Sequence, residues 1–393
     1  MSLKSLGLSF IILFILRRKY KTLNLIEINA QSFLDNYSYF QNLHPESRIC
    51  PVLKSNAYGH GLTLVGKFID EEIKPEFICV DSLYEAYELE KSGIKNKILI
   101  IGYTFPENFK FRKIPFSIPV FDLETIKYLS QYQSGAKVHL KIDTGMNRLG
   151  IKEEQFKEFS ECLKKHSNIE IEGIYTHLSD AENNDETFSL LQIERFKKAV
   201  KFFEDKGFEF KWKHSCSTAG SFRFKNAGSN MIRLGIGFYG ISPFSDDSPF
   251  DKKLSCNLKS CLRFVSHVSQ IKIINKGETV SYNRTFKSSK RTKIAILPLG
   301  YYDGFDRRLS NIGKVTIAGA SCPILGRVCM NVSVVDVSNV KNPHVGQEVV
   351  IYDNMTDSEN SIKNIARKID TIPYELLVKL SETTRRELKE KFS

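Results

Sequence analysis

Short apolar runs alternate with amphipathic stretches along the first part of the chain. Eight of these runs have the length and composition of buried β-strands: Ile49–Leu53, Phe77–Val80, Ile98–Ile101, Ser117–Phe121, Val138–Ile142, Ile171–Thr176, Phe210–Lys213 and Ile232–Gly237. Most stretches between them carry helical spacing, and so does the stretch before the first run, at Phe33, Tyr37 and Phe40. Eight strands that alternate with helices predict an α/β protein with a (β/α)8 TIM-type barrel. The alternative is an open doubly wound sheet, but no Gly-x-Gly-x-x-Gly follows the first strand.

The pattern changes after about Ser255. Short apolar runs are joined there by Gly, Asn and Pro turns, and only Ser361–Ile369 has the spacing of a longer helix. The expected strands are Leu262–Ile274, Glu278–Tyr282, Lys293–Leu297, Lys314–Ile317, Val332–Val337 and Gln347–Tyr352. We therefore predict an N-terminal extension over residues 1–23, a barrel domain over 24–255 and a mainly β C-terminal domain over 256–393.

The N-terminal extension is apolar from Leu6 to Leu16 and basic at Arg17, Arg18 and Lys19. The apolar run is too short to span a bilayer, which takes about 20 residues. A signal peptide carries its charge before the apolar core rather than after it. The pattern favours an interfacial or buried helix, and weak membrane association of residues 6–19 is one hypothesis for its role.

Composition and charge narrow the function classes. Hydrophobic residues make up 41% of the 393 residues, which is enough for a large core and excludes a disordered or fibrous chain. The net charge of +12 invites a nucleic-acid interpretation, but the basic residues are dispersed, so we predict no nucleic-acid partner. The eight cysteines form no Cys-x-x-Cys pair and no zinc-spaced cluster, which indicates a reducing cytoplasm and no metal site.

The most informative residue is Lys54, which follows the first predicted barrel strand. Barrel active sites form at the C-terminal ends of the strands. Two interpretations are open for a lysine at this place. Its ammonium extends into solvent, or it is partly desolvated, has a lowered pKa and forms a Schiff base with a carbonyl compound. The glycines after Tyr58 allow a close backbone approach, and the Tyr58 hydroxyl can bind an anion.

Motifs in a fixed order extend this observation along the chain. They are PVLKSNAYGHG (51–61), HLKIDTGMNRLG (139–150), GIYTH (173–177), RLGIGFYG (233–240), VSYNRTF (280–286), LGYYDG (299–304) and GRVCM (326–330). Each resembles a motif of the bacterial alanine racemases, which are pyridoxal-phosphate enzymes of fold type III. The resemblance extends from about Leu25 to Tyr374.

The resemblance implies a barrel domain, a β domain and a homodimer whose active sites are shared between subunits. It implies that pyridoxal 5′-phosphate is the cofactor and that the reaction interconverts L-alanine and D-alanine. The role of the family is to supply D-alanine for peptidoglycan. The resemblance therefore also implies a bacterial, cytoplasmic enzyme.

The resemblance implies which residues carry the reaction. Lys54 would hold the cofactor and act as a base on one face of the substrate, and Tyr282 would be the acid/base on the other face. A free tyrosine has a pKa of about 10, so cationic neighbours must favour its phenolate. In the family a hydrogen-bonded pair beside the cofactor does this, here His177 and Arg233, and Arg233 would face the pyridine nitrogen. Taken alone, His177 could be a core histidine and Arg233 a barrel ion pair.

Further positions match binding residues of the family. The cofactor phosphate would be held by Tyr58, Thr218, Gly235, Ile236 and Tyr374. Arg148 would donate to the phenolic oxygen of the cofactor beside the substrate, and Lys141 matches a lysine that is carbamylated in many members. Met330 would bind the substrate carboxylate through its backbone N–H, and Tyr301 would line the access route.

The chain also departs from the family pattern. Asn147, Ser217, Asn283 and Asn331 stand where the family often has Gly, Asn, Gly and Asp. Asn follows Gly in tolerance of a left-handed conformation, so Asn147 is compatible with the fold. Ser217 and Asn331 leave open a serine-preferring or broad-specificity racemase. The remaining alternatives are a non-catalytic cofactor carrier, which lacks the β domain, and a nucleic-acid-binding module.

Overall fold

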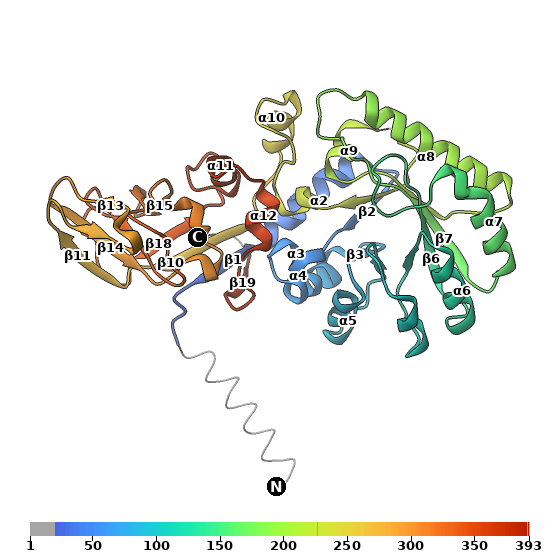
Figure 1. Cartoon of the computed structure of the whole chain (residues 1–393), viewed down its shortest axis with the longest axis horizontal. Helices are drawn as coiled ribbons and strands as arrows, with labels where there is room; N and C mark the ends of the chain where they lie inside the picture. Colours follow the sequence, from blue (N-terminus) through green and yellow to red (C-terminus); the bar gives the residue numbers. More distant parts are fainter. Residues whose placement is uncertain (1–19, 226, 391, 393) are drawn as a thin grey trace, which may run out of the picture. The chain divides into compact units, whose positions relative to one another are not determined.

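The computed structural model describes residues 20–225, 227–390 and 392, so the apolar segment at residues 6–19 lies outside it. Contacts within the chain define two compact units (Figure 1). The first, called here the β unit, comprises residues 20–27, Arg263–Asp353 and Thr383–Glu387. The second, the barrel unit, comprises Ile28–Leu262, Asn354–Glu382 and the described residues from Leu388 onward.

Eight parallel strands close into a ring in the barrel unit. They are β2 (Arg48–Pro51), β3 (Ile78–Val80), β4 (Ile98–Ile100), β5 (Ile118–Val120), β6 (Lys137–Lys141), β7 (Glu170–Tyr175), β8 (Trp212–His214) and β9 (Met231–Leu234). Ladders join β3 to β4, β5 through β8 in order, and β9 back to β2. Isolated parallel bridges connect β2 to β3 and β4 to β5, and a 3.1 Å backbone hydrogen bond from Arg233 to Cys216 connects β9 to the end of β8. This ring confirms the predicted (β/α)8 barrel, with one strand for each apolar run.

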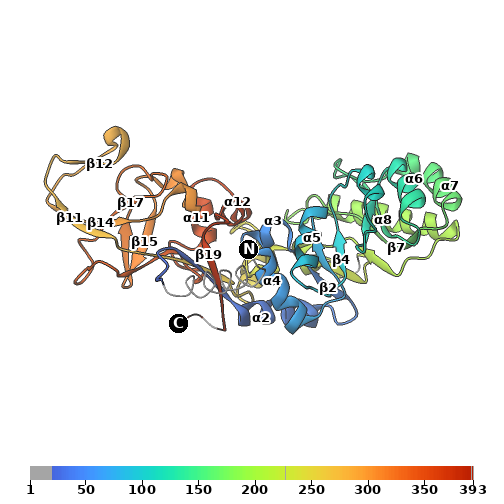
Figure 2. The ribbon, with the colours of Figure 1, turned by 90° about the horizontal axis from the view of Figure 1, so that it is seen from below.

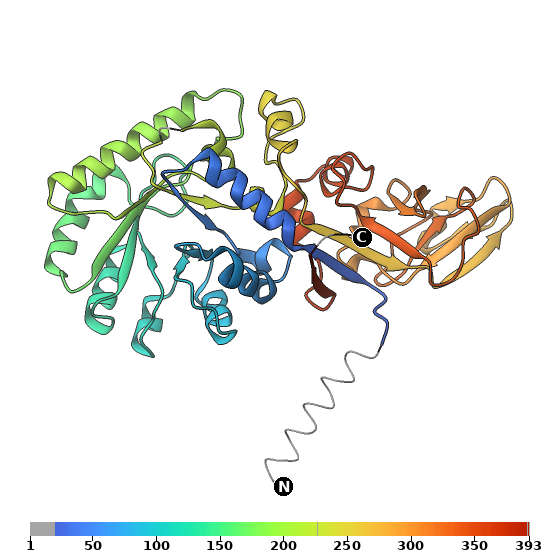
Figure 3. The same ribbon diagram turned by 180° about the vertical axis from the view of Figure 1, so that it is seen from behind.

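Helices follow the strands and cover the outside of the barrel, as α2 and α8 do in Figure 3 (blue and light green). The helices are α2 (Ala30–Leu43), α3 (Lys54–Tyr58), α4 (Leu62–Phe68), α5 (Leu83–Lys91), α6 (Leu123–Tyr132), α7 (Phe156–Lys165), α8 (Thr187–Asp205), α9 (Thr218–Arg223), α10 (Pro249–Ser255), α11 (Ile362–Lys368) and α12 (Pro373–Val378). Phe33 and Phe40 of α2 are fully buried, as the helical spacing predicts. Ser82 caps α5 by accepting the Glu85 N–H at 3.2 Å.

The β unit contains two sheets and a hairpin. The strand orders are β16-β15-β18-β10-β1-β19 and β11-β14-β17, and β12 pairs with β13. Figure 2 shows the hairpin at the edge of this unit. The strands are β1 (Leu25–Asn29), β10 (Leu262–His267), β11 (Gln270–Ile274), β12 (Thr279–Val280), β13 (Phe286–Lys287), β14 (Thr292–Leu297), β15 (Lys314–Ile317), β16 (Ala320–Pro323), β17 (Ser333–Asp336), β18 (Glu348–Tyr352) and β19 (Arg385–Lys389).

The second half of the chain differs in places from the sequence-based expectation. The run 262–274, expected as one strand, forms β10 and β11 in different sheets. Strands β1, β13, β16 and β19 lie outside the predicted runs. The segment Asn354–Glu382, with α11 and α12, belongs to the barrel unit although it lies beyond the expected boundary at residue 256. Within the described part of the chain, no helix has both the length and the apolar composition that a membrane crossing requires.

Candidate active site

The chain leaves β2 through an unusual turn that carries Lys54. The four residues 55–58 contain no glycine, yet their φ angles are positive, between 51° and 55°. A left-handed conformation costs an L-residue about 1–2 kcal/mol, so the surrounding structure must stabilise this turn. Gly59 ends the turn at φ 79°, where an added Cβ would lie 1.9 Å from the carbonyl oxygen of Leu377. A side chain at this glycine would clash with backbone.

Side-chain carboxylate and amide groups hold the turn in place. Glu85 accepts the Ser55 N–H at 2.6 Å through Oε1 and the Asp81 N–H at 2.8 Å through Oε2. The side chain of Asn56 accepts the Leu62 N–H at 2.7 Å through Oδ1. These bonds fix the backbone that directly follows the lysine. They therefore set the direction from which its amine enters the barrel.

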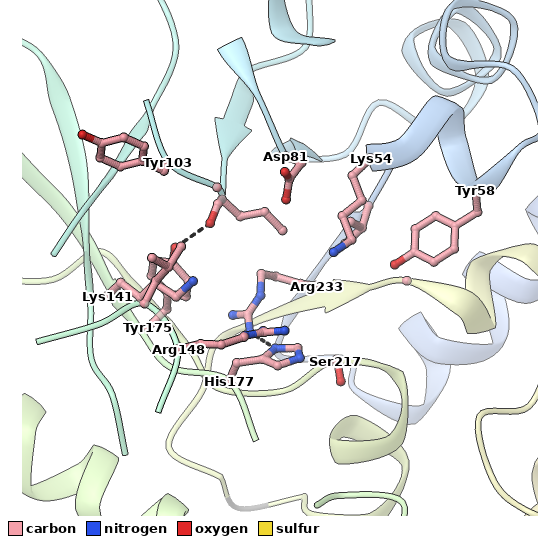
Figure 4. Close-up of a pocket in the computed structure, with 15 residues that line it drawn as sticks. Lys54, Tyr58, Asp81, Tyr103, Lys141, Arg148, Tyr175, His177, Ser217 and Arg233 are labelled. Atoms are coloured by element: carbon pink, nitrogen blue, oxygen red, sulfur yellow. Dashed lines mark hydrogen bonds between the residues drawn. The ribbon is translucent and has the colours of Figure 1, made fainter. Parts of the chain in front are cut away.

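A cavity of about 340 Å³ opens at this end of the barrel, a size typical of small-molecule sites. Its lining residues are Val52, Lys54, Tyr58, Asp81, Ile101, Gly102, Tyr103, Lys141, Arg148, Leu149, Tyr175, His177, Ser217, Arg233 and Gly235. Figure 4 shows Lys54 and Tyr58 reaching in from one side and Lys141 and Arg148 from the other. Lysines and arginines outnumber the one carboxylate, that of Asp81, so the cavity suits an anionic ligand.

Arg233 is a buried cation of this cavity, with 3% of its surface exposed. Its Nη2 donates to Thr176 O at 2.7 Å and to His177 Nδ1 at 3.2 Å (Figure 4). A guanidinium can only donate, so His177 Nδ1 is the acceptor and the ring proton is on Nε2. Burial, then the charges of Arg233 and Arg148, lower the pKa of His177 to about 3. His177 is therefore a neutral imidazole at pH 7, and Arg233 carries the positive charge of the pair.

Lys141 lies at the end of β6 and is largely buried. Burial, then the positive charges of Arg233 and Arg148, lower the pKa of its ammonium to about 8. Its Nζ lies 5.5 Å from the centre of the Tyr175 ring. A measurable fraction of this amine is therefore neutral at physiological pH.

The residues expected to bind a phosphate lie on the same unit around Tyr58. The ring centres of Tyr58 and Tyr374 are 6.0 Å apart. A Cβ at Gly235 would lie 2.9 Å from the Tyr58 hydroxyl, so the glycine keeps space free there. Thr218 Oγ1 accepts a backbone N–H at 3.1 Å and keeps its own proton to donate. The first N–H groups of the 3-10 helix Ile236–Tyr239 have no partner within that helix.

Tyr282, Tyr301 and Met330 belong to the β unit and are exposed by 71%, 43% and 55%. Tyr282 begins the short 3-10 turn Tyr282–Arg284, and its two neighbours, Ser281 and Asn283, have positive φ angles of 64° and 59°. Large side chains presented in this way are available to another molecule.

Sequence reasoning missed some residues of the cavity. Asp81, Tyr103 and Tyr175 line it, and none of them is among the site residues predicted from the sequence. Asp81 directly follows β3, and Tyr175 ends β7. A position at the C-terminal end of a barrel strand is the signal that could have found both.

The sequence matches two family models that together cover most of the chain. They are alanine racemase, N-terminal domain, over residues 28–243, and alanine racemase, C-terminal domain, over residues 261–388. The chain belongs to the alanine racemase family. It is therefore an isomerase of the pyridoxal 5′-phosphate-dependent class. The match of the C-terminal domain argues against a cofactor carrier that lacks a β domain.

Relatives with this name are similar over nearly their whole length. The alanine racemase of Carboxydothermus hydrogenoformans is 38% identical over 362 residues, covering 90% of this chain and 96% of its own. The alanine racemase of Methanococcus maripaludis is 34% identical over 362 residues, which cover 90% of this chain and 95% of the relative. The solved alanine racemase of Clostridium difficile 630 superposes with a TM-score of 0.88 at 31% identity, covering 94% and 97%. The alanine racemase of Bacillus anthracis, solved with bound L-Ala-P, superposes with a TM-score of 0.87 at 28% identity. The match covers 95% of this chain and 97% of that chain.

The residues of the cavity fit pyridoxal 5′-phosphate. Lys54 supplies an amine that can bond to an aldehyde. The cations around it complement an anionic phosphate ester. The missing Cβ of Gly235 leaves a cradle beside the Tyr58 hydroxyl, as a phosphate group requires.

Proposed function

We propose that this chain is an alanine racemase that interconverts L-alanine and D-alanine with pyridoxal 5′-phosphate held at Lys54. The observation that carries the proposal is the cavity, in which Lys54 shares a small cationic space with the hydrogen-bonded pair Arg233 and His177. When bound, the cofactor supplies an electron sink that makes the Cα proton of an amino acid removable. Side chains of the protein would then remove the Cα proton and return it.

Hydroxyl and backbone groups would bind the cofactor phosphate: Tyr58, Thr218, Gly235, Ile236 and Tyr374. Arg148 would donate to the phenolic oxygen of the cofactor. Arg233 would face the pyridine nitrogen, and because it has no acceptor atom it would leave that nitrogen unprotonated. A weaker electron sink of this kind favours return of the proton over side reactions.

Racemisation requires a base on each face of Cα. The amine of Lys54 would take or return the proton on one face, and Tyr282 Oη of the partner subunit would do so on the other. His177 would donate its Nε2 proton to that oxygen, and the charge of Arg233 behind it would favour the phenolate. Since each face has its own base, the reaction would run in both directions.

The partner subunit would also contribute to substrate binding. The backbone N–H of Met330 would bind the substrate carboxylate, and Tyr301 would line the access route. Both are exposed in the β unit, as is Tyr282. The proposed assembly is a homodimer with shared active sites, and the proposed role is supply of D-alanine for peptidoglycan in the bacterial cytoplasm.

Lys141 is the proposed site of carbamylation. A pKa of about 8 leaves part of its amine neutral, the form that adds CO2. The product would be an anion able to orient Arg148. Intact-mass measurement in bicarbonate should find the mass of one CO2, lost in acid and absent from Lys141→Ala. A wild type without this added mass would contradict the proposal.

Attachment of the cofactor tests the proposed function directly. Wild type loaded with pyridoxal 5′-phosphate and reduced with borohydride should yield a peptide modified at Lys54. Lys54→Ala should yield none, and Lys67→Ala, an exposed lysine on α4, should behave as wild type. Modification of another lysine, or none in the wild type, would refute the proposal.

A further inference from the structure

A line of buried polar side chains leads from the cavity through the barrel interior. Arg233 Nη1 lies 2.6 Å from His214 Nδ1, and His214 Nε2 lies 2.8 Å from His139 Nδ1. His139 Nε2 in turn lies 3.4 Å from Glu172 Oε2. The four residues come from the neighbouring strands β6 to β9, and none is more than 4% exposed. Of these four residues, only Arg233 has a role in the proton transfers proposed above.

The barrel is shaped to hold both imidazoles. A Cβ at Gly173 would lie 2.3 Å from His139 Nδ1, so this ring occupies space that only a glycine leaves free. The ring of His214 is stacked on Tyr175, with a centre distance of 4.7 Å and an interplanar angle of 2°. These contacts fix the rings, and with them the order of the line.

The chemistry of the two ends determines where the protons lie. A guanidinium has only donors, so His214 Nδ1 must accept from Arg233, and the proton of His214 is on Nε2. That proton is donated to His139 Nδ1, which places the proton of His139 on Nε2. An ionised carboxylate has only acceptors, so its charge attracts this last N–H. Both imidazoles are then neutral, and the N–H on His139 Nε2, which has no hydrogen-bond partner among the described residues, faces the Glu172 carboxylate at 3.4 Å.

The surroundings of Glu172 keep it ionised. Ser117 Oγ donates to Oε2 at 2.8 Å, and Lys137 Nζ lies 3.7 Å from Oε1. Burial alone would raise the pKa of this carboxyl, but His139, Ser117 and Lys137 lower it to about 2. Burial lowers the pKa of both His139 and His214, which agrees with neutral rings. A buried positive charge and a buried negative charge are thus linked through two neutral groups.

We propose that Glu172 is a positioning residue for Arg233: its carboxylate ends the line, attracts the N–H of His139 and, through the two histidines, holds the guanidinium in its orientation toward the cavity. The inference rests on the proposed function, in which Arg233 faces the cofactor and supports the base on the second face. A glutamine at position 172 would keep the shape of the side chain. Its amide carries no charge, so the attraction between the carboxylate and the N–H of His139 would be lost.

The test compares Glu172→Gln with Glu170→Gln. Glu170 is a matched control because it lies on the same strand, 3.7 Å from the same Lys137 Nζ, with a side chain that is 57% exposed. NMR of cofactor-free protein with 15N-labelled histidine reports which ring nitrogen carries the proton. Wild type and Glu170→Gln should have protons on Nε2 of His139 and His214. Glu172→Gln should keep this tautomer, because Arg233 still sets it, but should shift the Nε2 resonance of His139 from its position in the other two proteins.

Kinetics of the loaded enzyme add a second measurement. Glu172→Gln should lower kcat about tenfold with little change in KM, as when a carboxylate behind a metal-bound histidine is removed. Identical histidine spectra in the two variants would overturn the proposal. If Glu172→Gln does not fold, the wild-type spectrum decides, because a proton on Nδ1 of His139 or His214 contradicts the line. Loss of racemisation in the wild type would refute the proposed function instead, and would leave the NMR result intact.

Discussion

The left-handed turn after Lys54 depends on Glu85, and Glu85→Gln should release it. The two carboxylate oxygens accept the N–H groups of Ser55 and Asp81 at 2.6 Å and 2.8 Å. A glutamine has one acceptor oxygen, and its NH2 group would face the second N–H donor. One backbone N–H would therefore lose its partner. The turn contains four consecutive left-handed residues, so its backbone strain would be released if it opened.

The magnitude follows from the conformation of residues 55–58. Four left-handed residues at about 1–2 kcal/mol each represent about 4–8 kcal/mol of backbone strain. An unsatisfied donor costs about 1–3 kcal/mol, and each 1.4 kcal/mol is about a factor of ten in an equilibrium. Local opening of the turn should become about 10- to 100-fold more frequent in Glu85→Gln.

Hydrogen exchange measured by mass spectrometry on peptides spanning residues 53–61 is the assay. Exchange there should accelerate about 10- to 100-fold while the barrel strands stay protected. Glu88→Gln is the control, because Glu88 is on the same helix and its carboxylate lies 3.9 Å from the exposed Lys91. Unchanged exchange at 53–61 in Glu85→Gln would refute the role of this carboxylate.

Further predictions concern the same unit and the second base. Gly59→Ala should lower the free energy of unfolding by about 3 kcal/mol through overpacking and a positive φ, whereas Gly93→Ala, with open space around it, should lose only about 1 kcal/mol in a denaturant titration. Tyr282→Phe should slow solvent-deuterium exchange at Cα from one alanine enantiomer far more than from the other; equal effects would reject the two-base scheme. The pKa of Glu172 is about 2 against an ordinary 4.5, so its stabilisation is complete above pH 4.5 and is lost as the pH falls toward 2. The stability difference between wild type and Glu172→Gln should shrink over that range, and a constant difference would contradict this.

The barrel could be predicted because each of its strands is a short apolar run bounded by polar residues. The strand pair β10 and β11 could not be separated, because alternation of apolar residues continues through the break between them. The segment Asn354–Glu382 packs with the barrel unit through contacts distant in sequence, and no local pattern contains that information.

Only those parts of the site that lie in local sequence motifs could be predicted. Lys54, His177 and Arg233 belong to motifs that resemble those of a known family, and all three line one cavity. The left-handed turn was hidden, because residues 55–58 include no glycine to indicate positive φ angles. The contact between His139 and His214 joins residues 75 positions apart, and only closure of the barrel brings them together.

The most direct test of the central claim is incubation of the purified, cofactor-loaded protein with L-alanine, followed by chiral separation. We predict equal amounts of L-alanine and D-alanine at equilibrium, no conversion by Lys54→Ala, and slower or no conversion of L-serine. Conversion of serine in preference to alanine would favour a serine racemase on the same fold. Failure of the loaded wild type to convert alanine would contradict the account.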